Sequence, residues 1–259
     1  VIAFGGGVIG DLAGFVASTY ARGLRLIQVP TSLLAQVDAA IGGKTAVNLD
    51  AGKNLAGTWH QPLAVFCDTK TLRSLPEAEL RSGLAEVVKY GLIAAPDLLR
   101  LVAERADEIF NREQKVLRTI VTRSAGIKAE IVSADEREQG KRAWLNYGHT
   151  LGHAIEHLHG GRLRHGEAIA LGMMAAAYIA EDSGRIDEEA VTLHRTTLEA
   201  VGLPVRASLE LEALQGALTR DKKYEGGVRF VLLEGLAQPR AGVPVGMDEI
   251  ERALKRMAE

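Results

Sequence analysis

A short apolar segment that leads directly into a glycine-rich loop constrains the fold of this chain most. Residues 1–4 are apolar, glycines occupy positions 5–7 and position 10, and residues 12–21 carry apolar side chains at helical spacing. This order predicts a strand, a tight loop and a helix. Glycines let a backbone approach a nucleotide phosphate, and the helix N-terminus supplies N–H donors to it. Because consecutive glycines are costly in a mere turn, the pattern favours a phosphate site over a turn without a ligand.

The segments after this loop alternate between strand-like and helix-like patterns. Residues 24–29 favour a strand, residues 33–41 can form a helix, and residues 63–68 are another strand candidate. Such alternation is typical of a parallel α/β layer. No acidic residue lies about twenty positions after the loop, so the common dinucleotide fingerprint is incomplete. Because the first residue is valine and already belongs to a predicted strand, we expect the chain to lack an upstream segment.

The character of the chain changes after Pro76. Only one further strand candidate, residues 228–233, lies among long segments with helical periodicity. We therefore predict an α/β fold followed by a mainly α fold, with domains at residues 1–76 and 77–259. The predicted helices are residues 77–92, 97–110, 114–134, 147–158, 167–183, 188–201, 209–218 and 247–257.

Composition and charge exclude several classes of protein. The net charge of -2 gives no basic field that would attract nucleic acid or an anionic membrane. The longest apolar stretch, residues 168–180, is too short to span a bilayer and predicts a buried helix. Cys67 is the only cysteine, and we interpret it as a small buried thiol rather than a nucleophile. Together with the lack of a recognisable signal peptide, these features predict a cytoplasmic enzyme.

Three histidines with glycine neighbours indicate a metal or acid–base site. His149 and His153 are four positions apart, so a helix would place both on one face, and His165 follows at a predicted helix start. By spacing alone, the first two are either two metal ligands or one ligand and one acid–base group. The remaining histidines are interpreted as structural or solvated residues. They are His60, His157, His159 and His194.

Several charged residues lie on predicted helices that are otherwise apolar. Glu86 and Lys89 share one such helix, where buried charge is costly unless it is paired or bound to a metal. Lys128 lies on another, where the alternative is a lysine that extends to solvent at the helix edge. Arg142 would align with His149 if that helix began early. Loop cations would suit an anionic, phosphorylated ligand. They are Lys44, Lys53, Lys222 and Lys223.

Six segments together resemble the 3-dehydroquinate synthase family and occur in the order of that family. They span essentially the whole chain, so the resemblance is far more specific than any single motif. The segments are GGGVIGD (5–11), VPTSLLAQVD (29–38), GGKT (42–45), GKNL (52–55), EVVK (86–89) and LNYGHTLGHA (145–154). The resemblance implies a truncated Rossmann-like NAD-binding α/β domain, followed by a helical metal- and substrate-binding domain.

The resemblance also implies roles for individual residues. Glu86, His149 and His165 would bind zinc or cobalt, and His153 would lie near a substrate phosphate instead of on the metal. The NAD-binding residues would be Gly7, Val8, Ile9, Gly10, Asp11, Thr31, Ser32, Lys44, Lys53, Thr71, Leu72, Arg73 and Ser74. The substrate-binding residues would be Asp38, Lys44, Lys89, Lys128, Arg142, Asn146 and either Lys222 or Lys223. Arg22 would reach the site of a neighbouring subunit, which implies a homodimer.

The implied reaction converts 3-deoxy-arabino-heptulosonate 7-phosphate into 3-dehydroquinate and phosphate, a step of the shikimate pathway. It proceeds through transient oxidation by NAD, β-elimination of phosphate, re-reduction and intramolecular aldol closure. The alternatives are another sugar phosphate cyclase, a metal-dependent polyol dehydrogenase, and an inactive truncated chain. Arg142 together with Asn146 suits a substrate that bears a carboxylate, which favours the 3-dehydroquinate synthase reaction.

Overall fold

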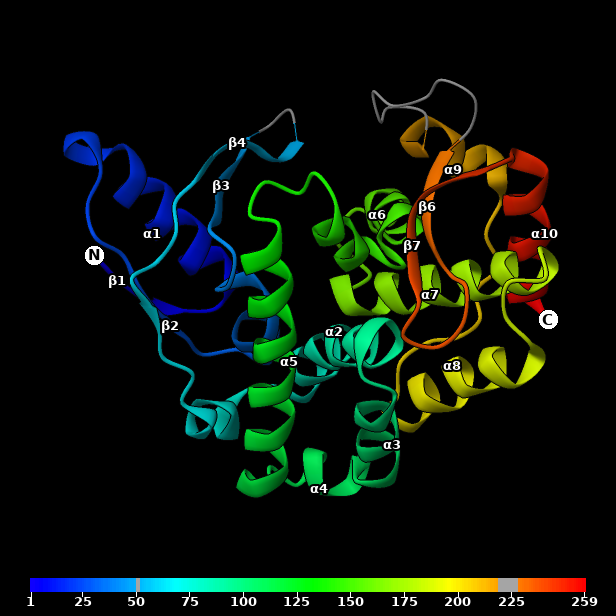
Figure 1. Ribbon diagram of the computed structural model, residues 1–259, viewed down its shortest axis with the longest axis horizontal. Coiled ribbons are helices and arrows are strands. Elements are labelled where there is room, and N and C mark those ends of the chain that lie inside the picture. The colour runs from blue at the N-terminus through cyan, green and yellow to red at the C-terminus, as the bar shows by residue number, and fades with distance from the viewer. Residues whose placement is uncertain (50–51, 219–227) are drawn as a thin grey trace. The chain divides into compact units, whose positions relative to one another are not determined.

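The computed structural model describes three stretches of the chain, drawn in colour in Figure 1. They are residues 1–49, 52–218 and 228–259, and at residues 52 and 53 only the backbone is described. Within these stretches, no helix is long and apolar enough to cross a membrane. Residues 168–180 instead form part of a helix buried in the protein, as their sequence predicts.

The described residues form two compact units. The first consists of Val1–Glu86 and Asp107–Glu136, and the second consists of Val87–Ala106 and Arg137–Glu259. Helix α2 (Glu77–Ala94) runs without interruption from the first unit into the second. The domain boundary placed between residues 76 and 77 stays a prediction.

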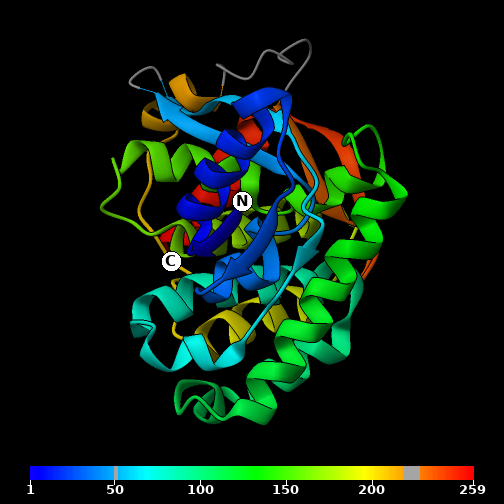
Figure 2. The same ribbon diagram turned by 90° about the vertical axis from the view of Figure 1, so that its left-hand side faces the viewer.

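The first unit is built on a parallel sheet with the strand order β1-β2-β5. Strand β1 (Ile2–Gly5) pairs with β2 (Ile27–Pro30), and β2 pairs with the short β5 (Ala64–Val65). Helix α1 (Gly7–Thr19) connects β1 to β2 and packs against both strands (Figure 2). The predicted order of strand, glycine loop, helix and strand is confirmed, although α1 begins five residues earlier than residues 12–21.

One glycine at the end of β1 and one inside α1 allow α1 to begin close to β1 and to pack closely on its neighbours. A Cβ atom on Gly5 would lie 2.7 Å from Cβ of Ile9, so the strand can turn directly into the helix. A Cβ atom on Gly14 would lie 2.4 Å from Cγ2 of Thr45, on the adjacent hairpin. Because real Cβ atoms do not approach this closely, larger residues at either position would push α1 away.

An antiparallel hairpin of the first unit was not predicted from the sequence. It consists of β3 (Lys44–Leu49) and β4 (Gly52–Trp59) and packs against α1. The segment has small and polar residues instead of a clear apolar alternation, so its strands depend on tertiary packing rather than on a local pattern. Thr45, for example, is buried and lies 2.8 Å from the hydroxyl oxygen of Thr58.

The helices of the first unit match the sequence to different degrees. Helix α5 (Gln114–Ala134) has the predicted bounds. Residues 33–41 contain the short π-helix η2 (Ala35–Ala39). Residues 97–110 form α3 (Pro96–Glu104), which lies in the second unit, and α4 (Ala106–Phe110), because the backbone leaves the helical region at Arg105. The 3-10 helices η1 (Tyr20–Arg22) and η3 (Thr69–Ser74) complete this unit.

The second unit is organised around the buried helix α7 (His165–Asp182). Helix α7 packs against three other helices and one strand. These are α6 (His149–Leu158), α8 (Glu188–Ala200), α10 (Met247–Ala258) and β6 (Val228–Leu233). Helix α9 (Leu211–Leu218) packs against α6. The observed order of elements confirms the predicted fold class, a parallel α/β part followed by a mainly helical part.

Strand β7 (Pro239–Val245) was also missed, and it pairs antiparallel with β6. Its two prolines argue against a strand in the sequence, yet proline is tolerated where a strand has a hydrogen-bonded neighbour on one side only. The 3-10 helix η4 (Lys141–Asn146) ends before Tyr147, which has a non-helical ψ angle of 126°, and α6 begins at His149 after Gly148, whose φ angle is +76°. The conditional alignment of Arg142 with His149 is therefore wrong, since Arg142 lies on η4 and not on α6.

Candidate metal centre and surrounding residues

Glycines bring the start of α6 into close contact with α7. A Cβ atom on Gly172 would lie only 1.9 Å from the carbonyl oxygen of Gly148. A Cβ atom on Gly152 would lie 2.8 Å from Cδ1 of Ile169. This packing fixes the first turns of α6 against the first half of α7, and it thereby positions the histidines that these two helices carry.

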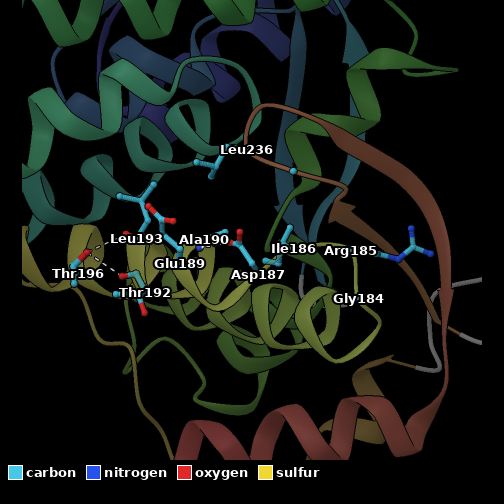
Figure 3. A pocket seen from close by; sticks show the side chains of 11 residues that line it. Gly184, Arg185, Ile186, Asp187, Glu189, Ala190, Thr192, Leu193, Thr196 and Leu236 are labelled. Carbon is cyan, nitrogen blue, oxygen red and sulfur yellow. Dashed lines mark hydrogen bonds between the residues drawn. The ribbon is translucent and has the colours of Figure 1, made fainter.

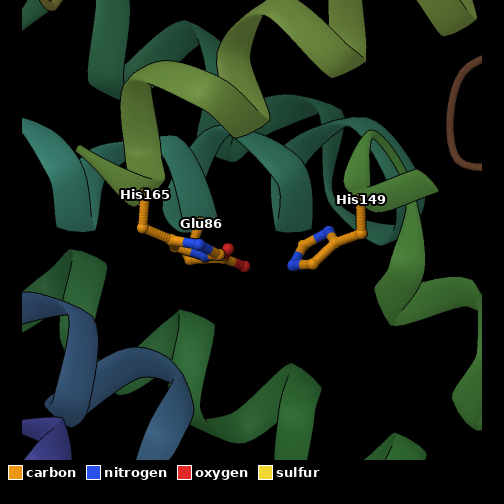
Figure 4. Close-up of side chains that lie close together, drawn as sticks. All are labelled: Glu86, His149 and His165. Carbon is orange, nitrogen blue, oxygen red and sulfur yellow. The ribbon is translucent and has the colours of Figure 1, made fainter. Parts of the chain in front are cut away.

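Glu86, His149 and His165 each offer one ligand atom, and these three atoms lie within 4.8 Å of one another (Figure 4). His149 is the first residue of α6 and His165 is the first residue of α7. Glu86 lies on α2, and it is the last residue of that helix that belongs to the first unit. Its side chain is buried, and both histidines are half-buried.

The donor set of this cluster fits a divalent transition metal. Two imidazole nitrogens and one carboxylate oxygen are ligands of catalytic zinc sites, which keep a further position open for water or substrate. The Nδ1 atom of His149 lies 3.0 Å from the carbonyl oxygen of Tyr147, so Nδ1 donates and Nε2 carries the lone pair. Such a backbone acceptor holds a metal-binding imidazole in one tautomer.

His153 lies beside this cluster and at a hollow in the second unit. Its ring centroid is 5.2 Å from that of His149 and 6.1 Å from that of His165. The side chain is exposed and lines a cavity of about 260 Å³. His157, interpreted from the sequence as a polar residue at a helix end, lines the same cavity. His153 thus has room for an anionic group next to the metal ligands.

The first unit brings three of the predicted residues together from different elements. The Nζ atom of Lys128, on α5, lies 2.7 Å from both Oδ1 and the carbonyl oxygen of Asp38, on η2. Lys128 is buried, so the alternative of a lysine extending to solvent is wrong. Burial raises the pKa of Asp11, on α1, to about 6; Lys128 opposes this rise and Asp38 adds to it.

Apart from Lys44 and Lys53, which lie on the β3–β4 hairpin, the predicted NAD-binding residues of the first unit follow the carboxyl ends of its parallel strands. The glycine loop follows β1, Thr31 and Ser32 follow β2, and the η3 segment follows β5. Open parallel sheets bind their ligands outside this edge. Ser32 Oγ accepts a hydrogen bond from the N–H of Ala35 at 3.3 Å, and the Cβ of a side chain on Gly6 would lie 3.6 Å from the same oxygen.

The other predicted residues lie in different surroundings. Lys44 is exposed, and its Nζ lies 5.6 Å from the ring centroid of Trp59. Lys89 and Arg142 are buried in the second unit. Asn146 donates a hydrogen bond to Glu138 at 2.6 Å. Arg22 is exposed just after α1, with a positive φ angle of 68°. The side chain of Lys53 and all of Lys222 and Lys223 lie outside the described residues.

A buried tyrosine–histidine pair supports the segment that precedes His149, and the sequence carried no signal for it. The hydroxyl of Tyr147 lies 2.8 Å from Nε2 of His194, whose Nδ1 lies 2.7 Å from the carbonyl oxygen of Ala190. Burial lowers the pKa of His194 to about 4 and raises the pKa of Tyr147. His194 is therefore a neutral, buried histidine with a structural role. Of the two roles that the sequence left open for it, structural or solvated, the structure confirms the first.

Cys67, His60 and His159 play structural parts. Cys67 is half-buried and not fully buried, so the prediction of a buried thiol is wrong in that respect; burial still raises the pKa of the thiol to about 11, which makes it a poor nucleophile, as the sequence predicts. His60 Nε2 lies 2.8 Å from the carbonyl oxygen of Leu24. His159 Nδ1 lies 2.9 Å from the carbonyl oxygen of Ile155 at the end of α6. These contacts agree with the interpretation made from the sequence.

A larger hollow of about 800 Å³ lies elsewhere in the second unit (Figure 3). The start of α8 and the turn between β6 and β7 form its walls. Asp187 on its rim caps α8 by accepting a hydrogen bond from the N–H of Ala190 at 2.9 Å. No described residue of the predicted sites is among the residues that line this hollow.

Comparison with protein families identifies relatives along most of the chain. A family described as "3-dehydroquinate synthase N-terminal" matches residues 1–82, and one described as "3-dehydroquinate synthase C-terminal" matches residues 83–224. The 3-dehydroquinate synthase of Paenarthrobacter aurescens (strain TC1) is 47% identical over 92% of this chain and 66% of that protein. The chain spans 65–66% of the length of the first curated relatives it matches.

Solved structures of related cyclases share the fold. The 2-epi-5-epi-valiolone synthase of Streptomyces hygroscopicus subsp. jinggangensis 5008, solved with NAD⁺ and Zn²⁺ bound, has a TM-score of 0.92 at 28% identity, over 99% of this chain and 72% of that chain. A 2-deoxy-scyllo-inosose synthase, solved with carbaglucose-6-phosphate, NAD⁺ and Co²⁺, has a TM-score of 0.89 at 33% identity, over 99% and 73%. Because its two halves match both parts of one family and its relatives are nearly half identical, this chain belongs to the 3-dehydroquinate synthase family.

Proposed function

We propose that this chain is a 3-dehydroquinate synthase that depends on NAD and on a zinc or cobalt ion. Its substrate would be 3-deoxy-arabino-heptulosonate 7-phosphate, and its products would be 3-dehydroquinate and phosphate. The observation that carries the proposal is the cluster of Glu86, His149 and His165, a catalytic type of donor set in a chain that is 47% identical to a 3-dehydroquinate synthase.

Each ligand and cofactor has residues suited to it. When bound, the ion supplies Lewis acidity at a substrate hydroxyl and NAD accepts a hydride transiently. The carboxyl edge of the parallel sheet offers backbone N–H groups and the start of α1 for the NAD phosphates. We assign NAD binding to Gly7, Val8, Ile9, Gly10, Asp11, Thr31, Ser32, Lys44, Lys53, Thr71, Leu72, Arg73 and Ser74.

The substrate carries a carboxylate and a phosphate, which call for cations and N–H donors. Arg142 and Asn146, four positions apart on η4, bind the carboxylate, because a guanidinium and an amide both donate to it. His153, beside its small cavity, donates a hydrogen bond to the phosphate. The other substrate-binding residues are Asp38, Lys44, Lys89, Lys128 and either Lys222 or Lys223.

The ion pair between Lys128 and Asp38 suits a role in substrate binding. A lysine whose ammonium is already oriented by a carboxylate loses little freedom when it binds a ligand oxygen. Asp38 in turn accepts hydrogen bonds from hydroxyl groups, which the substrate carries in a row. Together the pair would orient the substrate hydroxyls through one acceptor and one charged donor.

We further propose that the protein is a cytoplasmic homodimer in which Arg22 reaches the site of the partner subunit. Arg22 is exposed directly after α1, as a residue that contacts a partner must be. The proposal places the chain in the shikimate pathway, and thus in the biosynthesis of chorismate and the aromatic amino acids.

A second candidate is another sugar phosphate cyclase, favoured by the TM-score of 0.92 to a valiolone synthase. The sequence identity argues for the first candidate, at 47% against 28%. A polyol dehydrogenase is supported less, because a probable glycerol dehydrogenase from Sinorhizobium meliloti 1021 shares the fold at only 15% identity, with a TM-score of 0.62. The dehydrogenase differs from both cyclases because it releases no phosphate and accumulates NADH, whereas the two cyclases differ from each other in their substrate.

The test measures phosphate release from 3-deoxy-arabino-heptulosonate 7-phosphate in the presence of NAD and zinc. It compares this chain with a version as long as its relatives, each with and without a chelator. We expect chelator-sensitive release with no net NADH, restored by added zinc or cobalt. Net NADH would instead support the dehydrogenase. Phosphate release only from heptulose 7-phosphates without the carboxylate would support another cyclase. If neither version released phosphate from any of these substrates, the proposal would be contradicted.

A further inference from the structure

The face of α6 that carries His149 also carries a carboxylate to which the proposed reaction gives no role. His149, His153 and Glu156 occupy positions i, i+4 and i+7 of α6, and this spacing places three side chains on one face of a helix. The neighbouring helix α7 begins with His165. Nδ1 of His165 lies 3.3 Å from Oε2 of Glu156. Glu156 thus contacts the imidazole of a candidate metal ligand.

Burial and hydrogen bonding define the protonation of this contact. The side chain of Glu156 is 16% exposed and that of His165 is 27% exposed, so both groups have lost most of their water. A carboxylate in such a place needs a donor, and an imidazole N–H supplies one. Nδ1 of His165 therefore carries the proton, and Nε2 is the nitrogen that offers its lone pair to an ion.

We propose that Glu156 is a positioning residue for the metal ion, acting through His165. It holds the imidazole in the tautomer and ring orientation in which Nε2 binds the ion, and its negative charge makes that nitrogen a stronger ligand. This inference rests on the metal site of the proposed function. A carboxylate behind a metal-bound histidine is a common way to orient the ligand, and its loss lowers metal affinity.

The two candidate histidine ligands differ in the group that accepts a hydrogen bond from Nδ1. Nδ1 of His149 faces the neutral carbonyl oxygen of Tyr147, whereas Nδ1 of His165 faces a carboxylate. A side-chain substitution cannot remove the first acceptor, but a substitution at Glu156 removes the charge of the second. Substitution of Glu156 should therefore act on one ligand and leave the other in place.

A competing role for Glu156 is that of a direct ligand. His153, Glu156 and His165 also offer ligand atoms within 4.8 Å of one another. An ion held by these three, in addition to the first ion, would require His165 to lose its remaining proton and to bridge two cations. The positioning role uses both nitrogens of a neutral imidazole instead, one as donor and one as ligand. The geometry therefore favours positioning over a second ion site.

The test is a titration of the metal-depleted full chain with Co²⁺, followed by the visible absorption of the bound ion. It compares the wild type with Glu156→Gln, which keeps the shape of the side chain, and with Glu156→Ala. Glu199→Gln, at an exposed position of α8, is the matched control. We expect one bound equivalent in each protein, affinity about 10–100-fold lower for both Glu156 variants, and a wild-type value for the control.

Thermal unfolding of each metal-depleted protein shows whether the variants fold, and Glu156→Gln remains the decisive variant if Glu156→Ala does not. Unchanged Co²⁺ affinity in Glu156→Gln would overturn the positioning role. Two equivalents in the wild type, with loss of only one in the variant, would overturn it in favour of a second ion site. A wild type that binds no Co²⁺ would overturn this inference and the proposed metal site together. Failure of phosphate release alone would count only against the proposed reaction.

Discussion

At the scale of single residues, the first unit holds two half-buried carboxylates, Asp11 and Asp38, near one buried ammonium, that of Lys128. Asp38 and Lys128 neutralise each other in a direct ion pair. At Asp11 the loss of hydration outweighs the attraction of Lys128 and raises its pKa to about 6. The cluster therefore makes the stability of the protein depend on pH through Asp11.

We expect Asp11→Asn to stabilise the protein at neutral pH but not at low pH. A raised pKa means that the folded state binds the Asp11 proton more tightly than the unfolded chain does. The protonated carboxyl therefore stabilises the folded state fully below pH 3.8, and this stabilisation is lost as the pH rises to about 6. Asparagine stays neutral throughout. The variant should match the wild type near pH 4 and exceed it at pH 7 by on the order of 1 kcal/mol, allowing for partial exposure.

Urea unfolding of both proteins between pH 4 and pH 8 measures this difference directly. Asp107→Asn, at an exposed carboxylate of the same unit, is the control for replacing a surface aspartate by asparagine. A difference for Asp11→Asn that does not change between pH 4 and pH 8 would contradict the raised pKa of Asp11.

At the scale of elements, the packing of α6 on α7 places the histidines, and glycines make that packing possible. The carbonyl oxygen of Gly148 lies where a Cβ atom on Gly172 would be, so no other residue fits at position 172 without a shift of one helix. Since His149 and His165 begin these two helices, a small shift would change the distance between two metal-ligand candidates.

We expect Gly172→Ala to lower the free energy of unfolding by about 1–3 kcal/mol, because the added methyl group overpacks the helix contact. It should also weaken Co²⁺ binding, since the ligands move apart. Gly126→Ala is the matched control: it lies inside α5 with no atom near its added Cβ, and should stabilise the protein by about 0.5–1 kcal/mol. Equal effects of the two substitutions on unfolding would contradict this account.

At the scale of the whole molecule, the first unit exposes large apolar side chains on its sheet and on α1. Ile2 and Phe4 alternate along β1 with the buried Ala3, and each is more than half exposed. Leu12 and Val16, four positions apart on one face of α1, are each 45% exposed. Single exposed apolar residues are ordinary, but such rows favour association with another apolar surface.

We expect the purified chain to associate at micromolar concentrations through this apolar surface. The double variant Leu12→Ser with Val16→Ser should reduce association measured by light scattering, because it makes the row on α1 polar. Its free energy of unfolding should fall by only about 1–2 kcal/mol, since each side chain is already 45% exposed and loses only its remaining buried apolar surface. Unchanged association in a folded variant would show that α1 takes no part in it.

Local sequence patterns determined much of this fold. The glycine loop between an apolar run and a periodic segment predicted β1 and α1, and strong periodicity predicted α5 with its observed bounds. The resemblance carried by the six motifs named the ligand candidates Glu86, His149 and His165, whose ligand atoms lie together in the structure. These signals are local or shared with a family, so no knowledge of long-range contacts was needed to see them.

The tertiary structure alone decided the features that depend on partners distant in sequence. Strands β3 and β7 have weak local patterns and form because a neighbouring strand or helix supplies their contacts. Whether Lys128 pairs or reaches solvent depends on Asp38, which lies 90 positions away. His194 has a structural role because it contacts the hydroxyl of Tyr147. Glu156 contacts His165 because α6 and α7 pack against each other. The spacing of residues along the chain cannot predict such contacts, since they form only when separate helices and strands bury their surfaces against each other.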